Sequence, residues 1–406
     1  MTAHTVSLRR PAPVSAWRAT IAGFSASLVG IGLARFAYTP LLPAIIGAHW
    51  FAPADAAYLG AANLAGYLAG ALLARPLSAR LPVAATIKAM MVLATVSFFA
   101  SAHAQPFAWF FVWRVASGLA GGTLMVLAAP TVLQHVPPSR RGLAGGAIFM
   151  GVGAGIAASG TLVPLLLRQG LTATWLGLGV LSLVLTAVAW GGWPREPTPA
   201  TDHAAPRAVH SLPLRALYLE YGLNAVGLVP HMVFLVDYVA RGLGQGLAAG
   251  TQHWVLFGLG AMAGPIVAGH LADRIGFGRA LRLAFVIEAI AVALPLTNLG
   301  LPSLGALALI ASSIVVGAFV PGIVVLVLGR VHELLAHHPA GHKAAWSAAT
   351  TSFAILQAVA AYGLSFLFVT SGGSYTLLFG LGAAAMVLAL IVDLTVTRGA
   401  SRASDR

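Results

Sequence analysis

The sequence predicts an all-α integral membrane protein in which twelve transmembrane helices form two pseudo-symmetric six-helix bundles. Three observations carry this prediction. Of the 406 residues, 59% are hydrophobic and only 8% are charged, with a mean hydropathy of +0.88, whereas roughly a quarter of the residues in a soluble domain are charged. Twelve apolar stretches are long enough to cross a membrane. The basic residues gather in every second loop between them.

Each span is placed where about 20 mainly apolar residues occur together, enough for a helix to cross roughly 30 Å of hydrocarbon. The first six predicted spans are Arg18 to Ile46, Ala56 to Ala74, Val83 to Ala102, Phe107 to Ala129, Gly142 to Leu167 and Thr172 to Trp193. The second six are Leu214 to Val239, Gly250 to Ala272, Ala280 to Leu299, Ser303 to Leu328, Lys343 to Val369 and Ser374 to Val396. The first apolar run is longer than a signal-peptide core of roughly 7 to 15 residues, so we expect an uncleaved helix.

A polar segment separates the two sets of six spans. Residues 194–213 are rich in Pro, Thr, Ala and His, a composition typical of a solvated linker rather than of a packed domain. We therefore predict an N-terminal bundle over residues 1–193, a cytoplasmic linker over 194–213 and a C-terminal bundle over 214–406.

The basic residues predict the orientation of the chain, because cytoplasmic loops hold the excess of Lys and Arg. Among the loop residues, only Arg168 and Arg241 fall on one side of the predicted membrane. The other side holds Arg9, Arg10, Arg18, Arg75, Arg80, Arg140, Arg141, Arg195, Arg207, Arg215, Arg274, Arg279, Arg282, Arg330, Lys343, Arg398, Arg402 and Arg406. Both termini and the linker are therefore predicted to be cytoplasmic.

A charged, glycine-rich stretch joins the eighth and ninth spans and reads G-H-L-A-D-R-I-G-F-G-R. Its glycines permit a tight turn. Its carboxylate can favour a nearby helix N-terminus in one conformation and release it in another. We predict a conformational latch formed by Gly269, Asp273, Arg274, Gly276 and Arg279.

A weaker copy of this stretch lies 199 residues earlier, which indicates a duplication. Ala74 and Leu77 stand there in place of Asp273 and Gly276, so only one half keeps the full latch. Internal symmetry of this kind is typical of transporter folds. The matching pairs are Gly70 and Gly269, Leu72 and Leu271, Arg75 and Arg274, Arg80 and Arg279, Gly118 and Gly317, and Gly142 and Gly341.

The composition also excludes several classes of site. The chain has no cysteine, so disulfides, thiolate metal sites and cysteine nucleophiles are ruled out. A net charge of +13 suggests nucleic acid for a soluble protein, but here it reflects membrane orientation and we expect no nucleic-acid partner. The string G-V-G-A-G from Gly151 to Gly155 imitates a nucleotide-binding loop, yet no strand precedes it.

The six plus six spans, the linker and the motif G-x-L-A-D-R-x-G-x-G-R resemble the major facilitator superfamily of secondary transporters. Arg114, Gly118 and Gly122 form R-x-x-x-G-x-x-x-G in the fourth span, which is similar to that superfamily's second motif. Within the superfamily, G-L-A-R-F-A-Y-T-P-L-L-P from Gly32 to Pro43 resembles the first span of the YbfB/YjiJ-like group of bacterial transporters. The resemblance covers essentially the whole chain. It implies a rocker-switch fold with a central cavity, in a monomer of the bacterial cytoplasmic (inner) membrane.

Charges inside the hydrocarbon are candidate functional groups, because burying one costs from about 2.5 to over 10 kcal/mol. Arg35 lies near the middle of the first span, and Tyr38 and Thr39 follow on the same helical face. We expect this face to bind a solute that is anionic or forms hydrogen bonds. The alternative is that Arg35 pairs with a helix C-terminus or a carboxylate. The resemblance supports a mechanistic role for Arg114, which can pair with substrate, with Glu220 or with backbone carbonyls.

The seventh span carries a polar stripe of Glu220, Asn224, Gly227 and His231 at helical period. The first and seventh spans face one another across the cavity in the superfamily, so the resemblance implies that Arg35 can approach Glu220 or His231. Glu220 is the predicted proton-coupling residue, with His231 as a second candidate. The alternative is that Glu220 snorkels to water.

Together these features predict a secondary active transporter that moves a small anionic or zwitterionic organic solute by alternating access, coupled to protons. A glycine motif in the fifth span favours efflux over import, although Ile156 stands where exporters carry a proline. The alternative class is a non-transporting membrane solute sensor or an intramembrane enzyme. The sequence contains no H-E-x-x-H, paired aspartates or G-x-S-x-G, so we expect no enzyme activity.

We also expect no cofactor and no metal. Four histidines crowd the loop before the eleventh span, but no carboxylate or cysteine pattern accompanies them. They predict a solvated, pH-sensitive loop and are His332, His337, His338 and His342. Glu288, in the ninth span, receives no role from the sequence.

Overall fold

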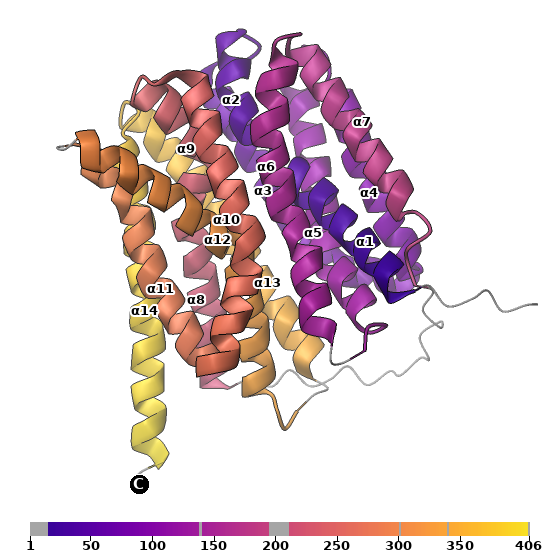
Figure 1. The fold of residues 1–406 in the computed structure, drawn as a ribbon, viewed down its shortest axis with the longest axis vertical. Helices are drawn as coiled ribbons and strands as arrows, with labels where there is room; N and C mark the ends of the chain where they lie inside the picture. Colours follow the sequence, from indigo (N-terminus) through magenta and orange to yellow (C-terminus); the bar gives the residue numbers. More distant parts are fainter. Residues whose placement is uncertain (1–14, 138–139, 195–210, 300–301, 339–340, 405–406) are drawn as a thin grey trace, which may run out of the picture.

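A computed structural model describes residues 15–137, 140–194, 211–299, 302–338 and 341–404 (Figure 1). The described residues contain no strand, and twelve helical runs among them are long and apolar enough to cross a membrane. The predicted all-α architecture with twelve spans is therefore confirmed. The predicted linker residues 195–210 and the outermost residues of both termini lie outside the described ranges.

The N-terminal bundle contains the first six spans. The first span is built from α1 (Ala16–Ser27), the π-helical turn η1 (Leu28–Leu33) and α2 (Tyr38–Gly47). The others are α3 (Pro53–Arg80), α4 (Val83–Ala100), α5 (Phe107–Leu133), α6 (Arg141–Leu167) and α7 (Leu171–Ala189).

The C-terminal bundle repeats this order. Its first span is again composite, with α8 (Leu212–Val229), the π-helical turns η3 (Pro230–Phe234) and η4 (Tyr238–Gly242), and α9 (Leu235–Asp237) between them. The remaining spans are α10 (Gly246–Ile275), α11 (Phe277–Ala293) with the 3₁₀ turn η5 (Leu294–Leu299), α12 (Pro302–Leu334), α13 (His342–Thr370) and α14 (Tyr375–Ser404).

Several helices are longer than their predicted spans. The second span was expected over Ala56 to Ala74, but α3 continues through Pro76 to Arg80. Hydropathy marks only the part of a helix that lies in hydrocarbon, whereas the helix itself continues into the polar region where its charged end can be solvated.

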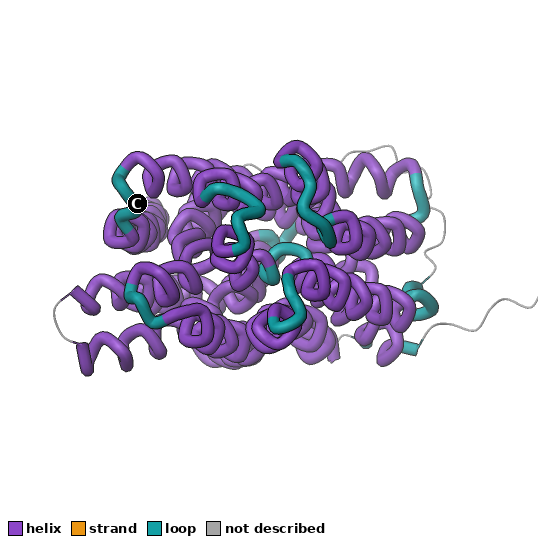
Figure 2. Tube along the Cα trace, turned by 90° about the horizontal axis from the view of Figure 1, so that it is seen from above, coloured by secondary structure: helices purple, strands orange, loops and turns teal. Residues whose placement is uncertain are grey.

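The two bundles lie side by side, with their helices seen end-on in Figure 2. Each contains one pair of helices in very close contact, α3 with α5 and α10 with α12. A Cβ atom added to Gly118 would lie 1.9 Å from the Asn63 carbonyl oxygen, and one added to Gly317 would lie 2.0 Å from that of Phe257. These glycines are one of the pairs at the 199-residue offset, so equivalent residues make equivalent close contacts in the two halves.

We call the end of the molecule where α1 begins, α7 ends and α8 begins the linker side; it is the lower end in Figure 1. Near the opposite side the two bundles touch. Tyr58 stacks on Tyr362 with ring centroids 6.3 Å apart, and Phe36 packs on Trp254 at 6.0 Å. The helices α6 and α10 also meet there, where a Cβ on Gly160 would lie 3.1 Å from the Val255 nitrogen, and at mid-length, where one on Gly153 would lie 2.4 Å from the Met262 nitrogen.

Toward the linker side the two bundles separate. A cavity of about 620 Å³ lies between Phe149 of the N-terminal bundle and Phe277 and Trp346 of the C-terminal bundle. The structure is therefore closed on the opposite side and open between the bundles on the linker side.

Candidate functional site

The first span is interrupted at residues 34–37, a turn between η1 and α2. The Ala34 carbonyl oxygen at this break accepts hydrogen bonds from Arg114 Nη1 at 2.9 Å and from Asn63 Nδ2 at 3.4 Å. Backbone polar groups within a membrane need such partners because lipid offers none. Arg114 and Asn63 therefore stabilise the break that presents Arg35.

Arg114 is buried, with 4% of its surface exposed. Its Nε donates to the Leu59 carbonyl oxygen at 3.2 Å, and its guanidinium lies 4.3 Å from the Tyr38 ring centroid. Of the three partners considered from the sequence, backbone carbonyls are the ones it binds here. No carboxylate in the described part of the chain pairs with it, so its positive charge is left uncompensated.

Arg35 is only partly buried. Its Nη2 lies 3.8 Å from the Met232 sulfur, and its guanidinium lies 5.0 and 5.2 Å from the ring centroids of Phe36 and Tyr67. Tyr221 of α8 is close enough to interact with it electrostatically. Among the described residues neither a carboxylate nor a carbonyl oxygen binds this guanidinium. Its strong hydrogen-bond donors are therefore available to a ligand.

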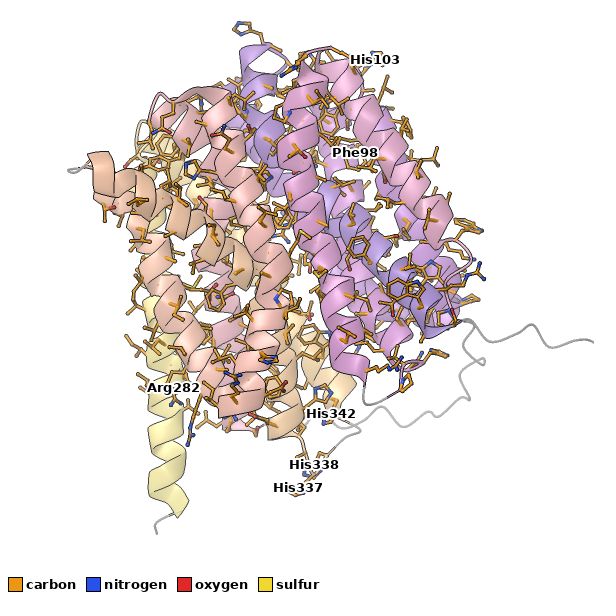
Figure 3. All side chains as sticks on the ribbon, in the orientation of Figure 1. Phe98, His103, Arg282, His337, His338 and His342 are labelled. Carbon is orange, nitrogen blue, oxygen red and sulfur yellow. The ribbon has the colours of Figure 1, made fainter. Side chains whose placement is uncertain are left out.

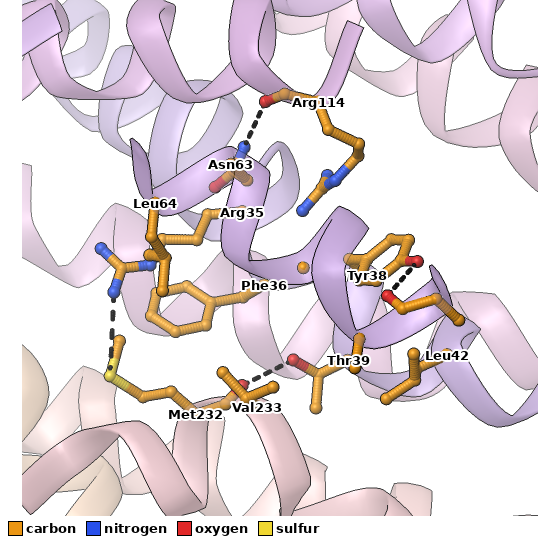
Figure 4. A pocket seen from close by; sticks show the side chains of 13 residues that line it. Arg35, Phe36, Tyr38, Thr39, Leu42, Asn63, Leu64, Arg114, Met232 and Val233 are labelled. Carbon is orange, nitrogen blue, oxygen red and sulfur yellow. Dashed lines mark hydrogen bonds between the residues drawn. The ribbon is translucent and has the colours of Figure 1, made fainter. Parts of the chain in front are cut away.

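The predicted neighbours Tyr38 and Thr39 line the same cavity as Arg35 and Arg114 (Figure 4). The Tyr38 hydroxyl donates to the Ala56 carbonyl at 2.8 Å, and Thr39 Oγ1 donates to the Met232 carbonyl at 2.7 Å. The cavity measures about 20 Å³, room for about one water molecule. In this conformation the cavity is therefore too small for an organic solute.

The polar stripe of the seventh span faces away from this cavity. Asn224 Nδ2 donates to Glu288 Oε2 of α11 at 2.6 Å, and His231 Nε2 lies 2.7 Å from Ser312 Oγ of α12. The expected approach of Arg35 to Glu220 or His231 is therefore wrong in this conformation. Successive helical residues point about 100° apart, so Met232 faces Arg35 while its neighbour His231 points into the C-terminal bundle.

The other two members of the stripe are Glu220 and Gly227. Glu220, in the middle of α8, is buried with 4% exposure, so it does not snorkel to water as the alternative required. Its charged neighbours are Asp393, Arg330 and Arg282, and no described residue forms a hydrogen bond or ion pair with it. Gly227 provides space for Met386 of α14, whose Cε would lie 2.5 Å from an added Cβ.

Sequence reasoning missed several residues that surround Arg35. Tyr67, Tyr221 and Met232 resemble ordinary apolar span residues and carried no signal. Gln357 of α13 did carry one, since a lone amide in an apolar span needs a partner. Its Nε2 lies 3.7 Å from the Met232 sulfur, while its Oε1 is buried and has no hydrogen-bond partner among the described residues.

The predicted latch lies at the linker-side junction of α10 and α11, with Gly276 at φ +84°. Asp273 and Arg274 are exposed and cap no helix end here. The N-terminus of α11 is instead bound by Glu333 of α12, which accepts from the Phe277 N–H at 2.9 Å. The remaining latch residues are the exposed Arg279 and Gly269, which faces Val325. That these residues form a latch, and that the latch is released in the open conformation described here, stays a prediction.

The histidine loop divides into two parts. His337 and His338 project away from the bundle at the linker side, whereas His342 lies against it (Figure 3). The rings of His332 and His342 lie 4.4 Å apart and line the linker-side cavity. In the described residues no group of three or more potential ligands could hold a metal ion.

Comparisons with known proteins agree with this architecture. Residues 27–394 match the profile of a family described as "Uncharacterised MFS-type transporter YbfB". A gallate transporter of Pseudomonas putida is 26% identical over an alignment of length 306 that covers 64% of this chain and 65% of the relative. The match thus spans less than two thirds of that relative.

Two solved structures share the fold. A D-xylose–proton symporter superposes with a TM-score of 0.71 at 13% identity, covering 93% of this chain and 97% of the other. The xylose transporter XylE from E. coli, in a partially occluded inward-open conformation, gives 0.72 at 12% identity, covering 93% and 98%. The family match covers most of the chain, and the structures share its twelve-span fold. The chain therefore belongs to a family of transporters rather than of enzymes, the YbfB-type major facilitator transporters, and it has the multi-pass fold of the solved structures.

Proposed function

We propose that this protein is a proton-coupled secondary transporter that takes up an aromatic carboxylate. The observation that carries the proposal is the Arg35 guanidinium, which lies between the two bundles without a carboxylate partner among the described residues. A solute carboxylate can form two parallel hydrogen bonds with such a guanidinium. Arg114 adds a second uncompensated positive charge to the same cavity.

The other residues around Arg35 favour an aromatic solute. Phe36 and Tyr67 lie against its guanidinium, and Trp254 packs on Phe36. These rings offer faces and edges for a solute ring. The unpaired Oε1 of Gln357 can accept a hydrogen bond from a ring hydroxyl. The gallate transporter that this chain resembles is named for a hydroxylated aromatic carboxylate, and that similarity supports the same class here.

In alternating access, the two bundles would separate on the side opposite the linker while they come together on the linker side. In the conformation described, Thr39 and Arg35 contact Met232 on one side of the site, and the linker-side cavity is open on the other. Opening the opposite side requires these contacts to break while the linker-side cavity closes. A solute carboxylate that binds Arg35 in place of the Met232 sulfur would compensate for the broken interactions.

The positive charges of Arg35 and Arg114 also bear on the direction of transport and on its coupling to protons. The sequence favoured efflux on a glycine motif that lacks its proline, whereas the site favours an anion. An anion that enters a cell moves against the inside-negative potential, at a cost of about 2.3 kcal/mol per charge per 100 mV. One co-transported proton per carboxylate removes that cost. We therefore propose proton-coupled import.

The orientation belongs to the same proposal. We infer a monomer in the bacterial cytoplasmic membrane. The linker side should lie in the cytoplasm, because the loops of that side hold most of the basic residues. The chain has no cysteine, so single cysteines at Arg80 and Arg168 can be labelled in intact cells. An impermeant maleimide should label only the cysteine at position 168. Labelling of position 80 alone would reverse the orientation.

Transport in proteoliposomes tests the substrate and the coupling. Wild-type protein should accumulate radiolabelled gallate when the outside is made more acidic than the lumen, and a protonophore should abolish this. Unlabelled benzoate-type acids should compete, whereas xylose and a cationic dye should not. Uptake driven equally well without a pH gradient would contradict the coupling. Competition by the dye or the sugar but not by the acids would contradict the solute class.

A further inference from the structure

Two faces of the seventh span make contacts with different parts of the molecule. On one face, Met232 contacts Arg35 and Thr39 of the first span. On the other face, Asn224 and His231 enter the interior of the C-terminal bundle. The π-helical turn η3 begins at Pro230 and holds both His231 and Met232. A displacement of this helix must therefore change both sets of contacts together.

The interior face of the seventh span contacts a carboxyl group that is buried and has few hydrogen-bond partners. Glu288 is fully buried at 0% exposure in α11. Its Oε2 accepts one hydrogen bond, from Asn224 Nδ2 at 2.6 Å, and its Oε1 has no partner among the described residues. Asn224 Oδ1 and His231 Nδ1 are also buried without such partners. An ionised carboxylate can only accept hydrogen bonds, and Asn224 Nδ2 is the one donor that Glu288 has among the described residues. We call Glu288 and Asn224 the buried cluster; a proton on Glu288 would remove the need for a second donor.

No charge in the described parts of the surrounding helices compensates an ionised Glu288. None of the titratable groups there forms a hydrogen bond or ion pair with it. Asp393 of α14 instead pairs with Arg282 of α11 itself, and Glu333 of α12 with Arg330. The other described acidic, basic and histidine side chains on these helices are Arg215, Glu220, His231, Asp237 and Arg241 in the seventh span, His253, His270, Asp273 and Arg274 in α10, Arg279 in α11 and His332 in α12, and Asp237 pairs with Arg241.

We propose that Glu288 is the proton-binding site of the transport cycle and that Asn224 couples its protonation to the seventh span. This inference rests on the proposed proton-coupled function and names the residue that carries the proton. It differs from the sequence prediction, in which Glu220 holds that role. Glu220 lies one helical turn from Asn224 toward the linker side, where it relays the proton between the linker-side solvent and the buried cluster.

The mechanism follows from the contacts. With the proton bound, Glu288 is neutral and fits its apolar surroundings. Loss of the proton leaves a carboxylate whose single donor is Asn224, and the buried charge draws in Asn224 or water. Either change displaces the seventh span and with it Met232, the residue that Arg35 and Thr39 contact on the solute side.

Two assays on the same proteoliposomes test the proposal. Gallate exchange at equal pH on both sides needs no net proton movement, whereas accumulation driven by a pH gradient does. For one proton per solute, a gradient of about one pH unit supports about tenfold accumulation. Glu288→Gln should keep exchange near the wild-type rate and lose the accumulation and the solute-dependent lumenal acidification. Asp55→Asn, an exposed carboxylate at the start of α3, is the matched control and should keep both.

Two further variants separate Glu288 from its neighbours. Glu220→Gln should slow accumulation but reach the wild-type plateau, because a relay affects rate and not stoichiometry. Asn224→Asp should shift the pH dependence of accumulation while exchange persists, which a purely structural role would not produce. Full proton coupling in Glu288→Gln, or loss of the plateau in Glu220→Gln alone, overturns the proposal.

A measurement on the unmodified chain covers the case in which Glu288→Gln does not fold. A hydrophobic carbodiimide reacts with protonated carboxyl groups in apolar surroundings, and peptide mass spectrometry locates the adduct. We expect an adduct on Glu288 that forms faster at lower pH and accompanies loss of accumulation. Inactivation with adducts only elsewhere overturns the inference. Wild-type protein that moves gallate without protons contradicts the coupled function and this inference with it, whereas a coupled wild type with an unaffected Glu288→Gln contradicts this inference alone.

Discussion

The two bundles share a framework and differ in where they place their polar groups. In both, a glycine at equivalent positions, Gly118 and Gly317, lets two helices meet at backbone distance. The N-terminal bundle turns the positive charges of Arg35 and Arg114 toward the boundary between the halves. The C-terminal bundle keeps Glu288 with Asn224 in its own interior.

The difference indicates how a duplicated fold acquires two tasks. Every span needs close helix packing, whereas an ionisable group buried in a span is costly and is a candidate for a functional role. A cation at the boundary between the bundles can bind a solute. A carboxyl group inside one bundle can bind a proton that moves separately from the solute. The seventh span, which touches both through Met232 and Asn224, connects the two tasks.

The largest expected effect comes from the N-terminal charge. Arg35→Gln should lower gallate exchange and binding roughly 10- to 150-fold, since a hydrogen bond to a charged group is worth about 1.5 to 3 kcal/mol. Arg35→Lys should recover part of the loss, because it keeps the charge but not the planar pair of donors. Exchange kinetics give the measurement, and Arg168→Gln, an exposed arginine on the opposite side, is the control. An equal loss of exchange in Arg168→Gln would contradict the role of Arg35 in binding the solute.

The shared framework predicts the next effect. Gly118→Ala and Gly317→Ala should each destabilise the protein by about 1 to 3 kcal/mol, because the new Cβ must displace backbone. In Gly363→Ala and Gly380→Ala nothing lies within 4 Å of the new Cβ, so no loss is expected. Thermal unfolding in detergent, followed by tryptophan fluorescence, compares the four. A loss confined to one bundle would contradict the equivalence of the two halves.

A smaller effect is expected at the contact between the bundles. Thr39→Val removes the hydrogen bond to the Met232 carbonyl and should favour opening on the opposite side. Such bonds in membranes average about 0.6 kcal/mol, which corresponds to about a threefold change in population. The alkylation rate of a cysteine placed at Ala57, a cavity residue, should rise accordingly. Thr161→Val, whose hydroxyl bonds only its own helix, should leave the rate unchanged.

The smallest effect compares one buried hydrogen bond in each bundle. His231 with Ser312 and Thr95 with Ser182 lie at 2.7 and 2.8 Å. Double-mutant cycles on unfolding should give each pair a coupling energy of about 0.6 kcal/mol. Only disruption of the His231 pair should also alter proton-driven accumulation, because Ser312 of that pair also donates to the Ala291 carbonyl of α11, the helix that carries Glu288. An equal effect on accumulation from the Thr95 pair would show that loosened packing alone accounts for it.

Hydropathy, the basic loops and the 199-residue offset were sufficient to predict twelve spans in two related halves. These features depend on the membrane as a solvent and on local sequence, so they can be read without coordinates. Arg35, Tyr38, Thr39 and Arg114 were also identified in advance because a charge in an apolar span is rare, and the structure brings all four to one cavity.

The direction in which the seventh span turns its polar stripe could not be predicted. Periodicity shows that Glu220, Asn224 and His231 share a face but not which neighbour that face meets. The π-helical turn at Pro230 further changes the register between His231 and Met232. Glu288 received no role for the same reason, since its partner lies 64 residues away in the chain.

The most direct test of this division of labour places Arg35→Gln and Glu288→Gln in the same reconstitution and measures gallate exchange and proton-driven accumulation for each. The structure predicts that Arg35→Gln loses both activities, whereas Glu288→Gln loses only accumulation. If Glu288→Gln abolishes exchange as fully as Arg35→Gln, or if Arg35→Gln exchanges gallate at the wild-type rate, then solute and proton are not handled by separate halves.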